Sequence, residues 1–537
     1  MLAAVLLVVS ACEDNFLDIN TDPNNPTTAP LSQLLTTSQI HISNVTSLST
    51  AGLSSTLSTF MHQVTQRGGA DQYGTQGSDF EIGASWNNLY TGALEDLRVI
   101  IDKGTAEGDL QYVGIAKILK AYAYSIVVDA WGEAPFSEAN LMPEVRFPAF
   151  DNGADIYTAL FAMIDEGIAD LANEEATNVN TPGVDDLIYG GNVNSWRKFA
   201  KTLKLRLYNQ VRLAPNASDF NVAANVNALL SEGDLIGDAS EDFELTYGTS
   251  VSPENRHPAF VREYGTAGAQ KTYYISIWFW QVMTGRNPNG LFAGVNDPRV
   301  PYYFFNQLTG GGAPQNPVEF REGDFLSIHF GSIHPNQAQA QGASQTVLGL
   351  YPAGGRYDDG AGAVVGPASA AGDAPQRMLP YFNRLFIEAE LAQEGVSTGN
   401  ARALLDEAMR AAFDEVNAQV ASTASSQTIP TIADDDVDTY VNTILIEFDG
   451  EDAQGQLEII LTQKWIANFG NAIDTYNDYR RTGFPVIFDP NNDGNPLTQS
   501  ASQFQLSLPW RELDLTLNPN APNQKQPSQY RVFWDPS

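Results

Sequence analysis

The sequence predicts a mainly α-helical fold of paired helices, interrupted by a long loop-rich segment. In residues 31–240 and 380–485, apolar side chains recur at spacings of three and four, the period of a helix with one buried face. Over residues 241–375 this period fades, and glycine, proline and aromatic residues become frequent. Long segments without a regular period usually carry functional loops. We therefore expect a single domain over residues 31–537, with a helical scaffold and a loop-rich ligand side.

The segment Leu110–Ala139 organises the chain around it. Its first part predicts a helix whose apolar face contains Val113, Ala116, Leu119, Ala123 and Ile126. Small residues such as Gly114 would let a neighbouring helix approach closely. The helix runs into Asp129-Ala130-Trp131-Gly132-Glu133, and Pro135 prevents its continuation. A carboxylate, an indole and a glycine at the end of an apolar helix indicate a packed corner.

The rest of the scaffold repeats this pattern. Helices are expected over residues 31–66 (two, broken near Gly52), 86–101, 156–171, 194–212, 380–395, 401–413, 437–448 and 454–479. A short turn joins the helix over 86–101 to the organising helix, which predicts an antiparallel hairpin. Asn194 or Ser195 is the expected N-cap of the helix over 194–212. Its basic residues are expected on a solvated side; they are Lys198, Lys201, Lys204 and Arg206.

Charge and cysteine content exclude several functions. Lys and Arg total 29 against 64 Asp and Glu, a net charge of −35. This excludes a general nucleic-acid-binding protein, because phosphate binding needs clustered Lys and Arg. It also argues against a strongly anionic ligand unless a local basic patch is present. One cysteine permits neither an intrachain disulfide nor a zinc site of several thiolates, and no H-x-x-x-H motif is found.

The N-terminal residues 1–11 form a short apolar segment that ends in small residues directly before Cys12. Val9-Ser10-Ala11-Cys12 is similar to a bacterial lipobox, where cleavage leaves a lipidated cysteine as the new N-terminus. No Lys or Arg precedes the run, which is shorter than the ~15–30 residues of a usual signal peptide, so we expect the true start upstream. Residues 12–30 would then be a membrane tether. The alternative is an apolar terminus with an incidental buried cysteine.

Six strings in the chain resemble the signatures of one family. They are FLDINTDPNNP (16–26), DAWGEAPFSEA (129–139), NSWRKFAKTLKLR (194–206), FIEAE (386–390), YRRTGFP (479–485) and LPWRE (508–512). Together they resemble the SusD/RagB family, particularly its SusD-like second group, which are nutrient-binding outer-membrane lipoproteins of Bacteroidetes. The resemblance runs from Cys12 to about Arg511.

The resemblance implies tetratricopeptide-like helical pairs in a cell-surface lipoprotein, anchored in the outer membrane through Cys12. It implies that the protein captures a glycan or oligosaccharide without turnover and delivers it to a SusC-like TonB-dependent transporter. Two alternatives stay open: peptide binding, as in RagB-like members, and glycan hydrolysis on a helical scaffold. The strings mark the fold and do not name the ligand.

The family has no invariant binding motif, so candidate ligand-binding residues follow from chemistry. Sugars need aromatic faces for the CH sides of their rings and planar polar groups for their hydroxyls. Loop positions supply Arg67, Asp71, Gln72 and Tyr73, then Tyr273, Tyr274, Trp278 and Trp280. Trp278 and Trp280 would point to one side in an extended chain, whereas a helix would set them about 200° apart. The alternative for each candidate is a place in the core.

One loop predicts a weak calcium site. Asp489, Asn491, Asp493 and Gly494 match positions one, three, five and six of a calcium-binding loop. Ser500 stands where the bidentate Glu would be, so an ordinary Asn/Asp/Gly turn is the alternative. No organic cofactor is expected, because the glycines of residues 360–366 have the wrong spacing for a dinucleotide loop.

Overall fold

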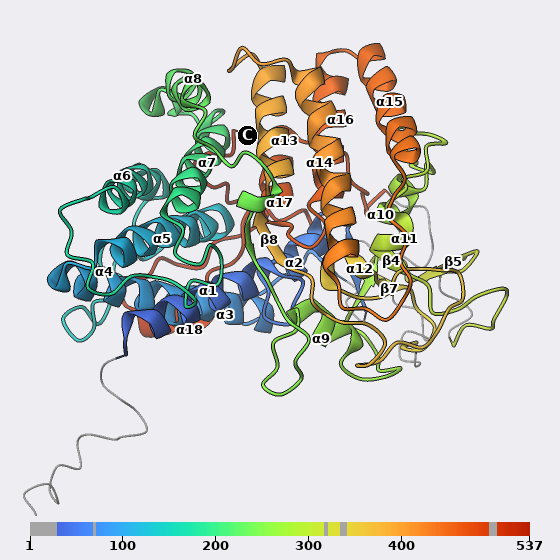
Figure 1. Ribbon diagram of the computed structural model, residues 1–537, viewed down its shortest axis with the longest axis horizontal. Coiled ribbons are helices and arrows are strands. Elements are labelled where there is room, and N and C mark those ends of the chain that lie inside the picture. The colour runs from blue at the N-terminus through green and yellow to red at the C-terminus, as the bar shows by residue number, and fades with distance from the viewer. Residues whose placement is uncertain (1–28, 68–70, 316–319, 333–340, 493–501, 537) are drawn as a thin grey trace, which may run out of the picture.

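The structure is a computed structural model that describes residues 29–67, 71–315, 320–332, 341–492 and 502–536. The predicted signal segment, Cys12 and nearly all of the tether lie outside these residues. The fold is mainly helical, as predicted, with two blocks of long helices and a region of short elements beside them (Figure 1). None of the helices in these residues is long and apolar enough to span a bilayer.

The first helical block contains α1 (Leu31–Thr46), α2 (Leu53–Phe60), α3 (Phe80–Asn87), η1 (Asn88–Leu94), α4 (Glu95–Glu107), α5 (Leu110–Trp131), α6 (Gly153–Leu171), α7 (Val193–Val211), η2 (Ala217–Phe220), α8 (Val222–Glu232) and η3 (Ala239–Glu241). The second contains α13 (Tyr381–Gln393), α14 (Ala401–Ser422), α15 (Asp434–Gly450), α16 (Ala453–Ala467) and α17 (Ile473–Thr482). A short helix, α18 (Glu512–Leu517), follows near the C-terminus.

Between the blocks, the loop-rich region contains only short elements. Its helices are α9 (Pro258–Tyr264), α10 (Ile277–Met283), α11 (Val300–Tyr303) and α12 (Leu350–Ala353). The described strands form two-stranded antiparallel sheets: β1 (Val64–Gln66) with β3 (Tyr273–Ile275), β2 (Phe243–Leu245) with β8 (Gln376–Leu379), β4 (Phe304–Phe305) with β7 (Val347–Leu348), and β5 (Phe320–Glu322) with β6 (Phe325–Ser327). These pairs are too small to stand alone and are held by the helices around them.

The predicted central hairpin is confirmed. The run α3–η1–α4 is continuous and ends at Gly108, which adopts a left-handed conformation (φ 82°) before α5 begins. Nearly every residue of α5 after its first turn is buried. A Cβ atom at Gly114 of α5 would lie 2.7 Å from the carbonyl oxygen of Gly167 in α6, so the absent side chain lets the two backbones approach.

The predicted corner at the end of α5 is also confirmed. The buried Asp129 carboxylate accepts hydrogen bonds from the Tyr157 hydroxyl, the Trp534 indole at 2.9 Å and the Asn477 amide at 2.9 Å. The Trp131 indole donates to the carbonyl oxygen of Pro509 at 3.1 Å. The Arg480 guanidinium also donates to the backbone carbonyl oxygen of Asp129 at 2.6 Å. The strings DAWGE, YRRTG and LPWRE therefore meet at this point, although DAWGE is far from the other two in the sequence.

Three details of the sequence prediction are wrong. The side chain of Asn192, rather than Asn194 or Ser195, caps α7. Arg206 of α7 does not lie on a solvated face; it is buried, and its Nε donates to Asp474 at 2.7 Å. The helix expected over 454–479 is split into α16 and α17, with Gly470 at φ 110° between them. Non-glycine residues rarely adopt this φ, so the helix cannot continue through it.

Candidate functional site

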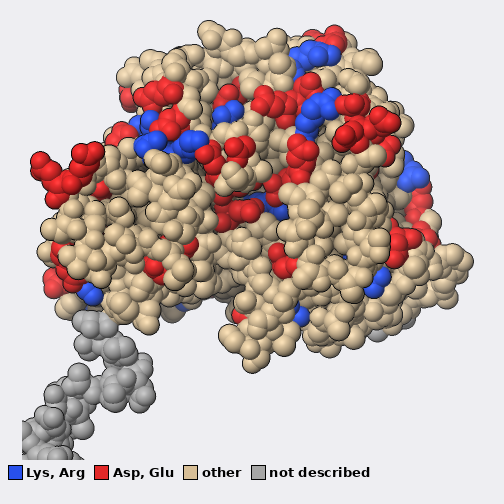
Figure 2. All heavy atoms as spheres, viewed as in Figure 1, with Lys and Arg blue, Asp and Glu red and all other residues tan. Residues whose placement is uncertain are grey.

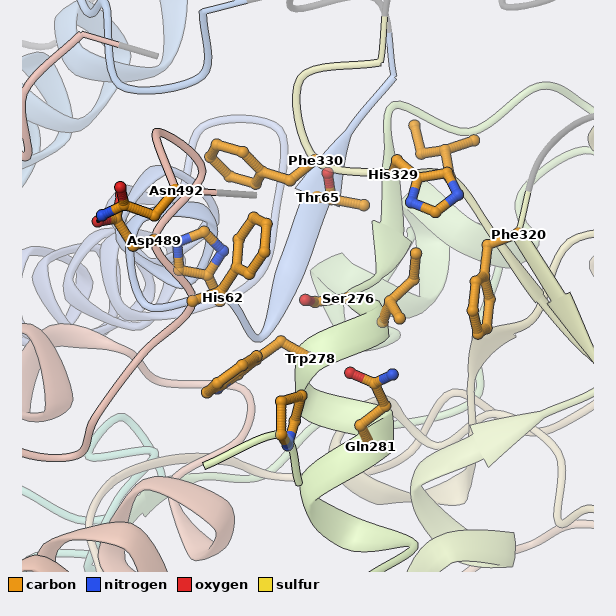
Figure 3. A pocket seen from close by; sticks show the side chains of 14 residues that line it. His62, Thr65, Ser276, Trp278, Gln281, Phe320, His329, Phe330, Asp489 and Asn492 are labelled. Atoms are coloured by element: carbon orange, nitrogen blue, oxygen red, sulfur yellow. Dashed lines mark hydrogen bonds between the residues drawn. The ribbon is translucent and has the colours of Figure 1, made fainter. Parts of the chain in front are cut away.

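A cavity of about 470 Å³ lies where β1, α10, residues 320–330 and the chain after α17 meet. It is lined by His62, Thr65, Ser276, Ile277, Trp278, Gln281, Pro288, Phe320, Ile328, His329, Phe330, Phe488, Asp489 and Asn492. Figure 3 shows Asp489 and Asn492 at one end, Phe320 and His329 at the other, and Trp278 and Gln281 along a third side. The volume and the mixture of rings with a few polar groups are typical of small-ligand sites.

Aromatic rings line one side and both ends of the cavity. The Trp278 ring lies 6.0 Å from the Phe488 ring, and Phe488 in turn lies 5.4 Å from His62. At the other end, the Phe320 and His329 rings are 5.8 Å apart and nearly perpendicular. Rings at both ends leave ring faces and edges for the CH groups of a ligand.

His62 is a strained and uncharged part of the wall. It follows α2, is fully buried and has a positive φ of 54°, which is uncommon for a residue with a side chain. Burial lowers its pKa to about 3, so the imidazole is neutral at neutral pH. Its Nε2 forms a 2.5 Å hydrogen bond with the Tyr73 hydroxyl. Its Nδ1 and the Trp278 Nε1 have no hydrogen-bond partner in the described part of the chain.

The β1–β3 sheet brings together the two groups of candidate residues chosen from the sequence. It pairs Gln66 with Tyr273 and Thr65 with Tyr274. Trp278 is the one candidate among the described lining residues of the cavity. Gln72 and Tyr73 are buried behind it: Gln72 donates to the Thr65 hydroxyl at 3.1 Å, and Tyr73 contacts His62. They therefore support two lining residues from outside the cavity.

The remaining candidates contact protein groups. Tyr273 and Tyr274 are buried; the Tyr273 hydroxyl lies 3.4 Å from the Gln66 amide nitrogen, and the Tyr274 hydroxyl accepts from Gln270 at 2.7 Å. The partly buried Arg67 donates its backbone N–H to the carbonyl oxygen of Thr272 at 2.8 Å. Exposed Asp71 accepts the backbone N–H of Ser502 at 2.9 Å.

Trp278 and Trp280 do not form a shared platform. Both lie in α10, so the helical alternative for this pair is the observed one, and their side chains point to different sides. Trp280 is 6% exposed and stacks on Phe325 with ring centroids 4.5 Å apart and an interplanar angle of 11°. Trp278 is half-buried and faces the cavity.

A family model described as "Starch-binding associating with outer membrane", SusD-like, matches residues 23–503. The chain belongs to this SusD-like family. Comparison with curated protein sequences finds no match. The family comprises binding proteins rather than enzymes, and its description associates it with the outer membrane.

Solved structures of the family share the fold. A chitin-binding protein is 18% identical, with a TM-score of 0.66 over 94% of this chain and 100% of that one. A SusD/RagB family protein from Bacteroides thetaiotaomicron is 19% identical, with a TM-score of 0.66 over 95% of this chain and 99% of that one. A chitin-binding SusD homologue from Flavobacterium johnsoniae is 17% identical, with a TM-score of 0.62 over 93% and 98%. At these identities the likeness shows the fold alone.

Most of the cavity of this SusD-like chain was missed by sequence reasoning. The aromatic residues His62, Phe320, Phe330 and Phe488 come from three segments of the chain that are far apart in the sequence, and no spacing connects them. One signal was available: Phe488 and Asp489 come shortly after the YRRTGFP string, so a segment that resembles a family signature leads into the site.

The loop predicted to bind calcium begins at Asp489, at one end of the cavity. Asp489 accepts hydrogen bonds from the backbone N–H of Asn491 at 2.9 Å and from the side-chain amide of Asn492. This is the Asn/Asp turn that was the alternative to a metal site. Asp493 lies outside the described residues, and calcium binding by this loop stays a prediction.

A second group of carboxylates lies in the core. Oxygen atoms of Asp242, Glu244 and Glu415 lie within 4.8 Å of one another. Arg377 pairs with Glu415 and has its Nε 4.0 Å from Glu244. The positively charged side chain of Arg377 therefore already lies beside these acids.

Proposed function

We propose that this SusD-like protein captures a glycan or oligosaccharide at the cell surface and passes it, chemically unchanged, to a SusC-like TonB-dependent transporter. The observation that supports glycan capture is the ring-lined cavity at Trp278. Its aromatic residues suit the CH faces of sugars, and Thr65, Ser276 and Gln281 offer hydroxyl and amide groups. Two of the similar structures are chitin-binding proteins, which makes chitin oligosaccharides a suitable first probe.

Titration calorimetry with oligosaccharides of chitin, starch and cellulose tests this function. We expect Trp278→Ala to weaken binding by about 1–3 kcal/mol, by analogy with bases stacked on aromatic side chains. Phe80→Ala is the matched control, because Phe80 is 66% exposed on α3 and does not line the described cavity. Binding of a peptide pool with no binding of any saccharide would instead establish the RagB-like alternative. If Trp278→Ala and Phe80→Ala weaken saccharide binding equally, the cavity is not the binding site.

We propose further that Cys12 carries the lipid anchor and that residues 12–30 tether the protein to the outer membrane. The support is its position directly after small apolar residues. In cells expressing the gene from its full-length start, Cys12→Ala should leave the protein in the soluble fraction, whereas Ser10→Ala should not. If Cys12→Ala still partitions with the outer membrane in detergent extraction, this cysteine is not the anchor.

A further inference from the structure

The described lining of the cavity contains a single charged side chain. Among its described lining residues none is Lys or Arg, and Asp489 is the one acid. The described lining of the cavity therefore offers no permanent cation to a bound anion.

The histidine at the Asp489 end does not supply the missing charge. Burial lowers the pKa of His62 to about 3, so at neutral pH its ring is uncharged. At pH 8, a histidine of ordinary pKa, about 6.5, is also neutral. Binding measured at pH 8 therefore reports a cavity without cationic histidine.

The arginines around α10 have partners of their own. Arg286 lies over the Trp280 ring at 4.8 Å, with its Nε 3.3 Å from Glu322. Arg262 lies over the Tyr273 ring at 4.7 Å and pairs with Glu263 at 3.0 Å. Neither is among the described residues that line the cavity.

An acidic sugar would lose more on entering this cavity than a neutral one. Seven of the lining residues are apolar: Ile277, Trp278, Pro288, Phe320, Ile328, Phe330 and Phe488. A carboxylate or sulfate placed among them loses water without gaining a cation, which is costly. Asp489 adds like-charge repulsion at its end of the cavity. Acidic side chains on the outer surface, prominent over the upper helices in Figure 2, add a weaker repulsion at a distance.

We propose that this cavity selects uncharged saccharides and rejects acidic ones, such as uronate-containing or sulfated chains, and that Asp489 is a specificity-determining residue. This proposal rests on the proposed function of glycan capture at the same cavity. It restricts the ligand to glycans of neutral sugars, N-acetylated sugars included.

The test compares oligosaccharides that differ only in charge. Hexasaccharides of chitin, cellulose and starch are titrated at pH 8, each beside its counterpart in which C6 hydroxymethyl groups are oxidised to carboxylates. We expect the oxidised member of a binding pair to bind at least about tenfold more weakly. The same titrations in 0.5 M NaCl separate the two causes: salt screens the long-range repulsion of the whole protein, whereas local desolvation and contact with Asp489 persist.

A charge-matched pair of variants tests Asp489. In Asp489→Asn, the affinity for the neutral member divided by the affinity for the oxidised member should fall several-fold. Glu174→Gln removes the same charge from an exposed site after α6 and should leave that ratio unchanged. Oxidised members that bind as tightly as neutral ones, or more tightly, overturn the selectivity while glycan capture stands. If no member of any pair binds, glycan capture fails and the selectivity fails with it.

Discussion

Carboxylates have arginine partners in the helical blocks, whereas the carboxylate at the cavity has none among the described lining residues. In the blocks, buried Glu390 of α13 contacts Arg481 of α17 at 2.6 Å and Arg212, which follows α7, at 2.8 Å. At the cavity, Asp489 accepts hydrogen bonds from its own loop, and no described lining residue is cationic. Arginine thus joins distant helices in the scaffold but is not among the described lining residues of the cavity. Buried ion pairs stabilise the scaffold, whereas the cavity has the lining that we propose for a neutral ligand.

The largest effect is expected from breaking the ion cluster of the scaffold. Arg481→Ala removes the closest partner of Glu390 and leaves that carboxylate buried beside Asp478. Loss of one member of a buried ion pair costs about 3–5 kcal/mol. We expect the free energy of unfolding, measured by urea denaturation, to fall by this amount.

The matched control for this change is an exposed pair in the same block. Arg402 and Asp449 are 2.7 Å apart, with side chains 45% and 50% exposed. Arg402→Ala should cost less than about 1 kcal/mol. Equal losses for Arg402→Ala and Arg481→Ala would show that burial does not set the strength of these pairs, and the contrast drawn above would fail.

A smaller effect is expected where the two regions meet in α10. Trp280 is buried on Phe325, and Trp280→Ala should lower the free energy of unfolding by about 3 kcal/mol, the low end for a buried Trp. Trp278 is half-buried, so Trp278→Ala should cost less than half as much stability. Urea denaturation of both variants checks the order, and a larger loss for Trp278→Ala would place that ring in the core.

These residues also show what sequence could predict. The scaffold was predictable because helices such as α6 bury one face at a regular spacing, and because strings such as YRRTGFP resemble signatures of the family to which the chain belongs. One exception is Arg206: the sequence predicts a solvated face for it, because its partner Asp474 lies far along the chain. The spacing of apolar residues within a helix carries no information about a partner so far along the chain.

The cavity could not be predicted in the same way. Its walls come from four separated segments, and each supplies two to five lining residues. The run around Trp278 was apolar throughout, so periodicity could not choose between strand and helix, and the structure changes from β3 to α10 within it. Candidates such as Tyr73 and Gln72 lie close to the cavity, but they lie behind its lining residues rather than among them.

The smallest effect is expected from the acids in the core, and it depends on pH. Glu244 of β2 lies beside Asp242 and Glu415, and burial raises its pKa to about 7, although Arg377 opposes this shift. An unfolded glutamate has a pKa near 4.3. Between these values the folded protein binds more protons, so the stability that protonated Glu244 contributes at low pH is lost as pH rises through about 7.

The size of this effect is measured against a variant, because His62 and His257 act in the opposite sense. Burial lowers the pKa of both histidines to about 3, so their contribution to stability grows as pH rises from about 3 to about 6.5, where an unfolded histidine loses its proton. Relative to Glu244→Gln, which keeps both histidines, the wild-type protein should lose about 1 kcal/mol between pH 6 and pH 8. Urea denaturation at the two pH values, with EDTA present so that no metal binds the acids, gives this difference. A wild-type-to-variant difference that does not change with pH would mean that Glu244 is ionised throughout, and that Arg377 neutralises it as Arg481 neutralises Glu390.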